Sequence, residues 1–352
     1  MKTIIPPVDR ELLRSELKEE FFVRPTNKAN NQIYDLTAHD APNVMREIAR
    51  LREISYRQGG GSTGEAMDID DLDTNEQHPY RQIVVWDPDN QQIVGGYRYL
   101  CCKDCGFRED GQPYITSAHL FYYTPYFIKD YLPYTIELGR AFVQPAYQQR
   151  EMGVKALYAL DNLWDGIGAV LCDYPDIKYL IGKVTIYPAF DADCRNLIYA
   201  YLSRYHLDRK GLFHPYNPVE ISVAGQEWAD EIFIGEDPVM NFHILQRAVR
   251  SRETVIPPMF SAYLNLTDHL LFFGNAVNDE LANVYETGIM VQVDQINPAK
   301  RERYMDAYWE YLKRKGEEFI RIRQERRLER QERRANRRLE RTILREEKNK
   351  NN

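Results

Sequence analysis

Glu137 and Arg140 are the two residues whose types and spacing most strongly indicate chemistry. They lie three apart in residues 135–143, a short run that is otherwise apolar and typical of a strand. Buried charges are costly unless they are paired, and a strand places residues three apart on opposite faces. Each charge therefore needs its own partner, unless Gly139 marks a bulge that re-aims one of them. The pair is either a structural ion-pair network or a proton-accepting carboxylate oriented by a guanidinium.

Arg150, Gly153 and Lys155 form a second candidate site, just ahead of a long amphipathic pattern. Backbone N–H groups at the start of a helix can hold the phosphate of a donor such as a phosphopantetheine arm, and a glycine leaves them exposed. The alternative for this segment is a simple turn.

Four more charges could form a cradle for an amino-acid acceptor, namely Arg52, Asp70, Asp73 and Arg98. On composition alone they would be surface charges. Asp70 and Asp73 lie at the end of residues 58–73, which contain three consecutive glycines and several acidic residues. That composition predicts a mobile loop.

The elements that position these residues alternate along the chain. Apolar spacing and capping residues predict helices over residues 7–23, 43–56, 155–172, 191–205, 239–250 and 258–266. Short β-rich runs predict strands over residues 82–86, 93–101, 135–143, 179–187 and 288–293. This interleaving predicts an α/β or mixed α+β fold with a central sheet.

The uneven distribution of charge indicates a boundary near residue 300, and we divide the chain into three segments. The whole chain is −7, but residues 300–352 hold 19 basic and 11 acidic residues and are +8, which leaves −15 for residues 1–299. We expect an N-terminal helix and leader (1–40), a catalytic domain (41–299) and a basic helical tail (300–352).

The tail reads as one long charged helix from Arg301 onward. It is either a free or loosely docked helix, or a basic surface for an acidic carrier protein or an anionic membrane. Nucleic acid is a weaker candidate, because few aromatic residues interleave with the later basic ones.

Composition also bounds the location and the cofactors. No apolar run is long enough to span a bilayer, and the N-terminus lacks the pattern of a signal peptide. We therefore expect a cytoplasmic protein, with peripheral contact at the inner face of the membrane through the tail. Cys102 and Cys105 form a CxxC, but no second ligand pair stands at zinc spacing, so no metal site is predicted. The 25 tyrosines indicate either amphipathic packing or a long, partly apolar pocket.

The charged residues occur in a fixed order along the chain: Arg52, Asp70-x-x-Asp73, Arg98 in a Gly-Gly-Tyr-Arg strand, and Glu137-x-x-Arg140. This order resembles the N-acyl-homoserine-lactone synthases. It is also similar to the ornithine-lipid N-acyltransferases and their hemolysin-like relatives, within the acetyltransferase (GNAT) superfamily. The string Ile136–Arg140 and the segment Pro257-Pro258 with Tyr263-Leu264 look closer to the lipid-forming group. The resemblance extends over residues 44–294.

The resemblance implies an acetyltransferase-type mixed sheet, splayed to admit a thioester arm. It implies acyl carrier protein, or coenzyme A, as the acyl donor, with no tightly bound cofactor. It implies Glu137 in proton removal and residues 58–73 as an acceptor-side lid. It places the remaining charges in a network beside the acceptor site: Arg52, Asp70, Asp73, Arg98 and Arg140. Lys155 departs from the family's phosphate loop, which puts tight coenzyme A binding in doubt.

These observations together predict direct acyl transfer. A fatty or 3-hydroxy fatty acyl group would pass from a thioester to the amine of ornithine, lysine or glycine, as the first step of amino-acid-lipid synthesis. Glu137 would deprotonate the amine, and a backbone N–H near Val143 would stabilise the oxyanion. The alternatives are a short-chain acetyltransferase that uses acetyl-coenzyme A, and a non-catalytic scaffold whose basic helix binds membrane or nucleic acid.

Overall fold

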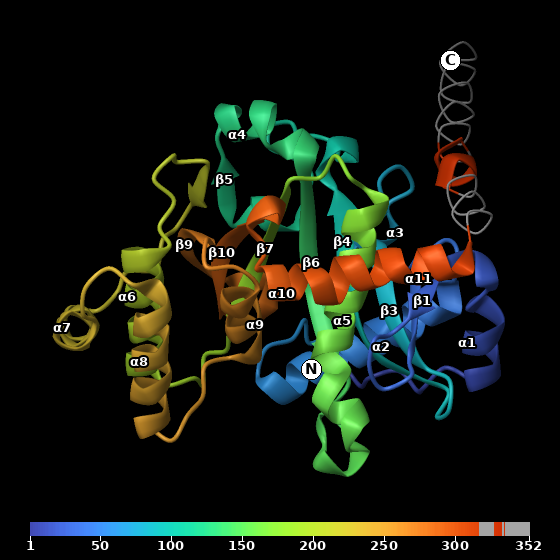
Figure 1. The fold of residues 1–352 in the computed structure, drawn as a ribbon, viewed down its shortest axis with the longest axis horizontal. Coiled ribbons are helices and arrows are strands. Elements are labelled where there is room, and N and C mark those ends of the chain that lie inside the picture. Colours follow the sequence, from blue (N-terminus) through green and yellow to red (C-terminus); the bar gives the residue numbers. More distant parts are fainter. Residues whose placement is uncertain (317–326, 333, 335–352) are drawn as a thin grey trace.

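A mixed eight-stranded sheet forms the centre of the computed structural model, which describes residues 1–316, 327–332 and 334 (Figure 1). In spatial order the strands are β1 (Phe22–Pro25), β2 (Gln32–Thr37), β3 (Arg81–Asp87), β4 (Gln92–Cys101), β6 (Thr135–Val143), β7 (Tyr179–Ile186), β10 (Val284–Gln292) and β9 (Leu271–Asn278). All neighbours are antiparallel except β6 and β7, which are parallel. The predicted mixed sheet flanked by helices is thereby confirmed.

Helices and a small second sheet cover both faces. Strands β5 (Phe121–Tyr123) and β8 (Phe213–Pro215) pair with each other. The helices are α1 (Arg10–Glu16), α2 (Pro42–Gly59), α3 (Asp71–Thr74), α4 (Pro125–Asp130), α5 (Val154–Asp173), α6 (Ala192–Tyr205), α7 (Val223–Ile232), α8 (Pro238–Ser251), α9 (Pro258–Leu266), α10 (Pro298–Arg301) and α11 (Ala307–Lys315). Within the described residues, no helix is long and apolar enough to cross a membrane.

One face of the sheet packs against α5, α6 and α9, and α8 packs on α6. Alternate strand residues such as Tyr97, Leu138 and Val184 join the apolar side of α5 in the largest core cluster. Two glycines let α5 come close to its neighbours: a Cβ on Gly166 would lie 2.4 Å from Ile83, and one on Gly168 would lie 2.6 Å from the backbone of Tyr304. The interior of a helix normally disfavours glycine, so these positions reflect packing.

Two separate units cover the opposite face. Helices α1 and α2 pack over β2, β3 and β4 through a cluster that includes Ile48 and Trp86. The segment that contains β5 and α4 packs over the other half through a cluster that includes Phe121 and Ile181. The polar residues described below lie on this same face.

The parallel pair β6 and β7 separates part-way along its length. Their register runs from Thr135 opposite Tyr179 to Leu138 opposite Gly182 and then stops. Strand β6 continues to Val143 and β7 continues to Ile186, each bonded only to its outer neighbour, β4 or β10. The sheet is therefore open as a wedge between these two strands.

The termini differ from their predicted forms. The helix expected over residues 7–23 spans only Arg10–Glu16, and the chain then enters the sheet as β1 and β2. A strand edge that joins an existing sheet gains main-chain hydrogen bonds, which a short, largely polar helix cannot match. Residues 22–37, within the predicted leader, thus belong to the central sheet.

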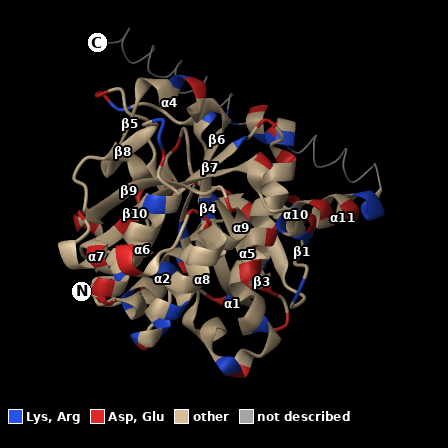
Figure 2. Cartoon of the chain, turned by 60° about the vertical axis from the view of Figure 1, so that its left-hand side comes forward, with Lys and Arg blue, Asp and Glu red and all other residues tan. Residues whose placement is uncertain are grey.

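The segment from Arg301 is helical as expected, but within the described residues it is not one uninterrupted helix. The chain runs through α10, a π-helical turn at Glu302–Asp306 and α11, which ends at Lys315 because Gly316 adopts a positive φ of 83°. Tyr304, Tyr308 and Leu312 are buried against the body, where this segment crosses α5 (Figure 1). Helix α11 carries both acidic and basic residues (Figure 2). The rest of the tail prediction lies largely outside the described residues.

Candidate active site

A row of polar side chains crosses one face of the sheet at the wedge. It contains Gln82 on β3, Arg98 on β4, Glu137 on β6, Lys183 on β7 and Glu286 on β10. All except Lys183 are at most 4 % exposed. So many buried polar groups need mutual partners, and the following contacts supply most of them.

Asp73 lies at the centre of the predicted acceptor network. Arg52 Nη1 donates to Asp73 Oδ2 at 2.9 Å, and Arg98 Nη1 lies 3.1 Å from the same oxygen. Gln82 Nε2 donates to Oδ1 of Asp73 at 3.0 Å, and Arg52 Nη2 donates to Gln82 at 2.5 Å. Burial raises the pKa of Asp73, but Arg52 and Arg98 outweigh it and hold the pKa below its usual value.

Asp70 links this core to Arg140. Arg98 Nη1 donates to Asp70 Oδ1 at 2.8 Å, and Arg140 Nη2 lies 3.5 Å from Oδ2. Arg140 also pairs with the buried Asp68 at 3.1 Å. The predicted acceptor residues are thus brought together, and Asp68 and Gln82 extend the set that sequence analysis found.

A β-bulge places Arg140 on this face. On β4, Gly96 pairs with Phe142 and Arg98 pairs with Gly139, so Arg140 and Ala141 together oppose Tyr97. Arg140 has a φ of 51°, an unusual value for a side chain other than glycine, asparagine or aspartate. The bulge explains how residues three apart in a strand point to one site.

Glu137 is enclosed by hydrogen-bond donors. Its carboxylate accepts from the backbone N–H of Thr116 at 2.9 Å and that of Ser117 at 2.8 Å, and also from the hydroxyls of Tyr80 and Ser117. The side chain is 1 % exposed. Each oxygen therefore already accepts two donors. Burial raises the pKa of Tyr80 well above its ordinary value, and the neighbouring Glu137 raises it further.

The segment 58–73 is tied down at several points. Gly60 has a φ of 90° and ends α2 as its C-cap. Glu53 accepts from Thr63 and from Gly64, and the chain N-terminus joins the loop through Lys2 N donating to Gly64 O at 2.8 Å. Asp70 then caps α3 in a capping box with Asp73. The network carboxylates thus sit on a segment with defined local structure.

This site can be compared with known proteins. A family model described as an acetyltransferase (GNAT) domain matches residues 51–157. A glycine N(alpha)-acyltransferase from Bacteroides thetaiotaomicron is 46 % identical over 310 residues, which cover 88 % of this chain and 91 % of that protein. A glycine N(alpha)-acyltransferase from Phocaeicola vulgatus is 43 % identical over 308 residues, covering 88 % and 94 %. This chain belongs to the GNAT N-acyltransferases. No solved structure gives a significant match.

Family membership confirms that this N-acyltransferase is an enzyme that acts on an amine. It also confirms the acetyltransferase-type sheet that the resemblance implied. The matched residues 51–157 include Arg52 at one end and Lys155 at the other, and therefore cover every predicted site residue.

The predicted donor-side residues of this N-acyltransferase have different environments. Arg150 and Gly153 are exposed just before α5. Lys155 instead donates to Asp87 Oδ1 at 2.6 Å and to Asp89 at 3.0 Å, in the β3–β4 turn. Its ammonium is thus already paired with carboxylates in this structure.

Val143 lies on the wedge side of β6. Its carbonyl accepts from Ser55 at 3.3 Å and from Gln148 at 2.6 Å, so it points away from β4. In an extended strand the N–H and C=O of one residue point to the same side. The Val143 N–H therefore also faces the wedge.

Three polar residues beside the wedge were missed by sequence analysis. Lys183 and Glu286 face each other across β7 and β10, and His119 Nδ1 donates to the carbonyl of Thr116 at 2.5 Å. Burial lowers the pKa of His119, and Lys183 lowers it further. A lysine in the middle of the predicted buried strand 179–187 was the available signal.

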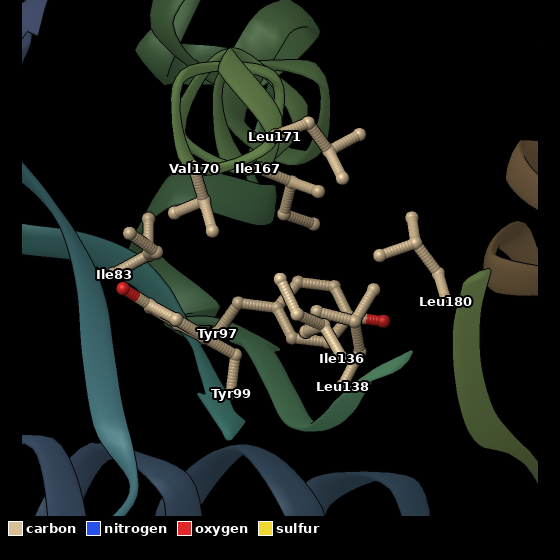
Figure 3. Close-up of a pocket in the computed structure, with 9 residues that line it drawn as sticks. All are labelled: Ile83, Tyr97, Tyr99, Ile136, Leu138, Ile167, Val170, Leu171 and Leu180. Carbon is tan, nitrogen blue, oxygen red and sulfur yellow. The ribbon is translucent and has the colours of Figure 1, made fainter. Parts of the chain in front are cut away.

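An apolar gap lies on the far side of the sheet, between the strands and α5 (Figure 3). Its lining includes Tyr97, Leu138 and Ile167, and it is too small to hold a water molecule. This gap is part of the core packing rather than a site for an acyl chain. Within the described residues, no group of three or more His, Cys, Asp or Glu is arranged to hold a metal ion.

Proposed function

We propose that this enzyme transfers a fatty acyl group from a thioester to the amine of glycine, giving an N-acylglycine. The observation that carries the proposal is the polar network of Arg98, Arg140 and Asp70, which Thr116 links to Glu137, beside an open wedge between β6 and β7. The glycine N(alpha)-acyltransferases named above support glycine over ornithine and lysine as the acceptor.

The donor is a thioester of acyl carrier protein, with coenzyme A as the alternative. Its arm enters between the separated strands, where no main-chain bonds need to be broken. The phosphate of the arm lies near Arg150 and Gly153, at the start of α5, because a helix N-terminus favours an anion. Lys155 can bind this phosphate only if its ammonium first breaks its contact with Asp87.

The reaction is a direct transfer. The amine nitrogen attacks the thioester carbonyl, the carbon–sulfur bond breaks, and the sulfur leaves as a thiolate that takes up a proton from solvent. The Val143 N–H points toward the wedge and stabilises the oxyanion. The proton of the amine passes to Glu137 through the hydroxyl of Tyr80 or Ser117, because both carboxylate oxygens already accept donors.

The product has one acyl chain and serves as the first intermediate of an amino-acid lipid. Such a role fits peripheral contact with anionic membrane through the basic residues of 300–352, at the cytoplasmic face. That contact would also bring the enzyme close to the next acylation step.

The test is a matrix of donors and acceptors with purified enzyme. Acyl carrier protein and coenzyme A thioesters of two to sixteen carbons are each mixed with glycine, ornithine or lysine, and N-acyl products are measured by mass spectrometry. We expect N-acylglycine from long-chain donors. Products from acetyl-coenzyme A alone would favour the short-chain acetyltransferase, and acylation of ornithine without glycine would overturn the proposed acceptor.

A further inference from the structure

Lys183 is the least tightly paired cation of the active site. The guanidinium groups of Arg52, Arg98 and Arg140 each lie within 3.1 Å of a carboxylate oxygen. Lys183 Nζ lies 3.9 Å from Glu286 Oε1, its nearest carboxylate. No hydrogen bond to this ammonium occurs in the part of the chain that the structure describes.

Glu286 is occupied by other donors. Thr185 Oγ1 donates to its Oε2 at 2.9 Å, and Asn278 Nδ2 donates to its Oε1 at 3.3 Å. Glu286 therefore offsets the positive charge of Lys183 from a distance of 3.9 Å but does not accept a hydrogen bond from its ammonium. An ammonium has three N–H donors, and in a site only 12 % exposed these donors need acceptors from solvent or from a ligand. This arrangement favours a further anionic partner that arrives with a ligand.

The position of Lys183 relates it directly to the reaction. Glu137 pairs with Ile181, and Lys183 follows two residues later on the same face of β7. Lys183 is also the first β7 residue beyond Gly182, where the pairing of β6 and β7 ends. It thus stands at the mouth of the wedge, diagonally opposite Glu137.

We propose that Lys183 binds the carboxylate of the amino-acid acceptor. The proposal rests on the proposed function, since an acceptor with a free carboxylate is required. In glycine one carbon separates the carboxylate from the amine, so a carboxylate held at Lys183 keeps the amine beside Glu137 and the wedge. The site would therefore select α-amino acids over simple amines.

The electrostatic surroundings of Lys183 agree with this role. Burial holds the pKa of Lys183 below its ordinary value, and Arg140 and Arg98 lower it further, against the opposing effect of Glu286 and Glu137. A bound carboxylate would favour the charged form, as an opposite charge does at close range.

The test compares glycine with glycinamide, which keeps the amine but lacks the negative charge. The variants are Lys183→Met, the charge-conserving Lys183→Arg, and Lys178→Met as a matched control on an exposed lysine of the same region. Because the two amines differ in basicity, the ratio of wild-type to variant kcat/KM is compared for each acceptor separately. Thermal unfolding of each variant checks its fold.

We expect Lys183→Met to lower kcat/KM for glycine at least about tenfold through KM, the size of one lost charge-assisted hydrogen bond. For glycinamide the change should stay within about twofold, since that acceptor never had the ionic contact. Lys183→Arg should recover part of the loss, and Lys178→Met should behave as wild type.

Equal losses for glycine and glycinamide would overturn the proposal and assign Lys183 a structural or proton-transfer role. If Lys183→Met does not fold, Lys183→Gln takes its place in the same comparison, and equal losses for the two acceptors would again overturn the proposal. If the wild type acylates ornithine instead of glycine, the proposed function fails, and ornithine and its amide then test Lys183 in the same way.

Discussion

Asp73 compensates two buried arginines at once, and its replacement should therefore be costly. Asp73→Ala leaves Arg52 with only the neutral Gln82 among its hydrogen-bond partners, while Arg98 keeps Asp70. Removing one member of a buried ion pair typically costs about 3–5 kcal/mol, and we expect a loss of that size in the free energy of unfolding, measured in urea. Asp71→Ala, at an exposed position of the same short helix, is the control. A loss no larger than the control would show that the network contributes little to stability.

Glu137 should be needed for turnover and for stability. In Glu137→Gln, the amide nitrogen must face a donor, either the N–H of Thr116 or that of Ser117. This conflict should cost about 1–3 kcal/mol in unfolding experiments. If Glu137 accepts the amine proton, kcat should fall about 10²- to 10⁴-fold. A destabilised variant with unchanged kcat per folded molecule would show that Glu137 is purely structural.

At the scale of elements, the loop after α2 comes close to the ends of β7 and β10, beside the proposed acceptor site. A Cβ on Gly61 would lie 2.5 Å from Val284 and 2.8 Å from Tyr187. Gly61→Ala must therefore shift either this loop or the side chains of Val284 and Tyr187. We expect the loop to move with the segment that carries Asp68 and Asp70, and acceptor KM to rise several-fold. Gly60→Ala is the control: it meets no neighbour within 4 Å but has a φ of 90°, so it should cost stability, about 1 kcal/mol, with KM unchanged. Equal acceptor KM values for the two variants would show that this loop does not contribute to acceptor binding.

Elements with strong local patterns could be predicted from the sequence, whereas strands that depend on distant partners could not. Strands 82–86, 93–101 and 135–143 and the helix at 191–205 were found because their patterns are strong and local. The strands β1, β2 and β9 were missed, because their place in the sheet depends on partners distant in sequence. The charged residues were grouped correctly by resemblance, but the bulge at Arg140 was only an option. The contacts of Lys183 and Glu286 arise from register between strands more than 100 positions apart.

At the scale of the whole molecule, residues 298–315 should be essential to the fold. A chain that ends at residue 297 lacks the buried side chains Tyr304, Met305, Tyr308, Tyr311 and Leu312. Each buried side chain of this size contributes roughly 1.5–3 kcal/mol, and together they rival the total stability of a typical domain, about 5–15 kcal/mol. We expect this chain to lose cooperative unfolding.

A chain that ends at Gly316 is the informative comparison. It should unfold cooperatively and keep measurable acyl transfer to glycine, with weaker use of acyl carrier protein or of anionic membrane. Complete loss of activity from this folded truncation would contradict the expectation and show that residues 317–352 are needed for the transfer itself.

His206 should make stability depend on pH. It is 4 % exposed, its Nδ1 donates to the carbonyl of Leu270, its Nε2 lies 3.2 Å from the hydroxyl of Tyr201, and burial lowers its pKa from 6.5 to about 4. The unfolded chain therefore binds the proton more tightly. The stability that the neutral His206 side chain contributes is fully present above pH 6.5. It is lost as the pH falls toward 4, which lowers the free energy of unfolding by about 3 kcal/mol in total. The difference in unfolding free energy between wild type and His206→Gln should shrink by that amount from pH 7 to 4, and parallel curves would contradict the assignment.

The central claim is acyl transfer to the amine of glycine, and the most direct measurement is made in a host that expresses the enzyme. Cells receive isotopically labelled glycine, and their lipids are analysed by mass spectrometry beside cells that express equal amounts of Glu137→Gln. We predict a new long-chain N-acylglycine that carries the label with the wild type and is strongly reduced with the variant. A new lipid without the label, or no new lipid from folded wild-type enzyme, would contradict the claim.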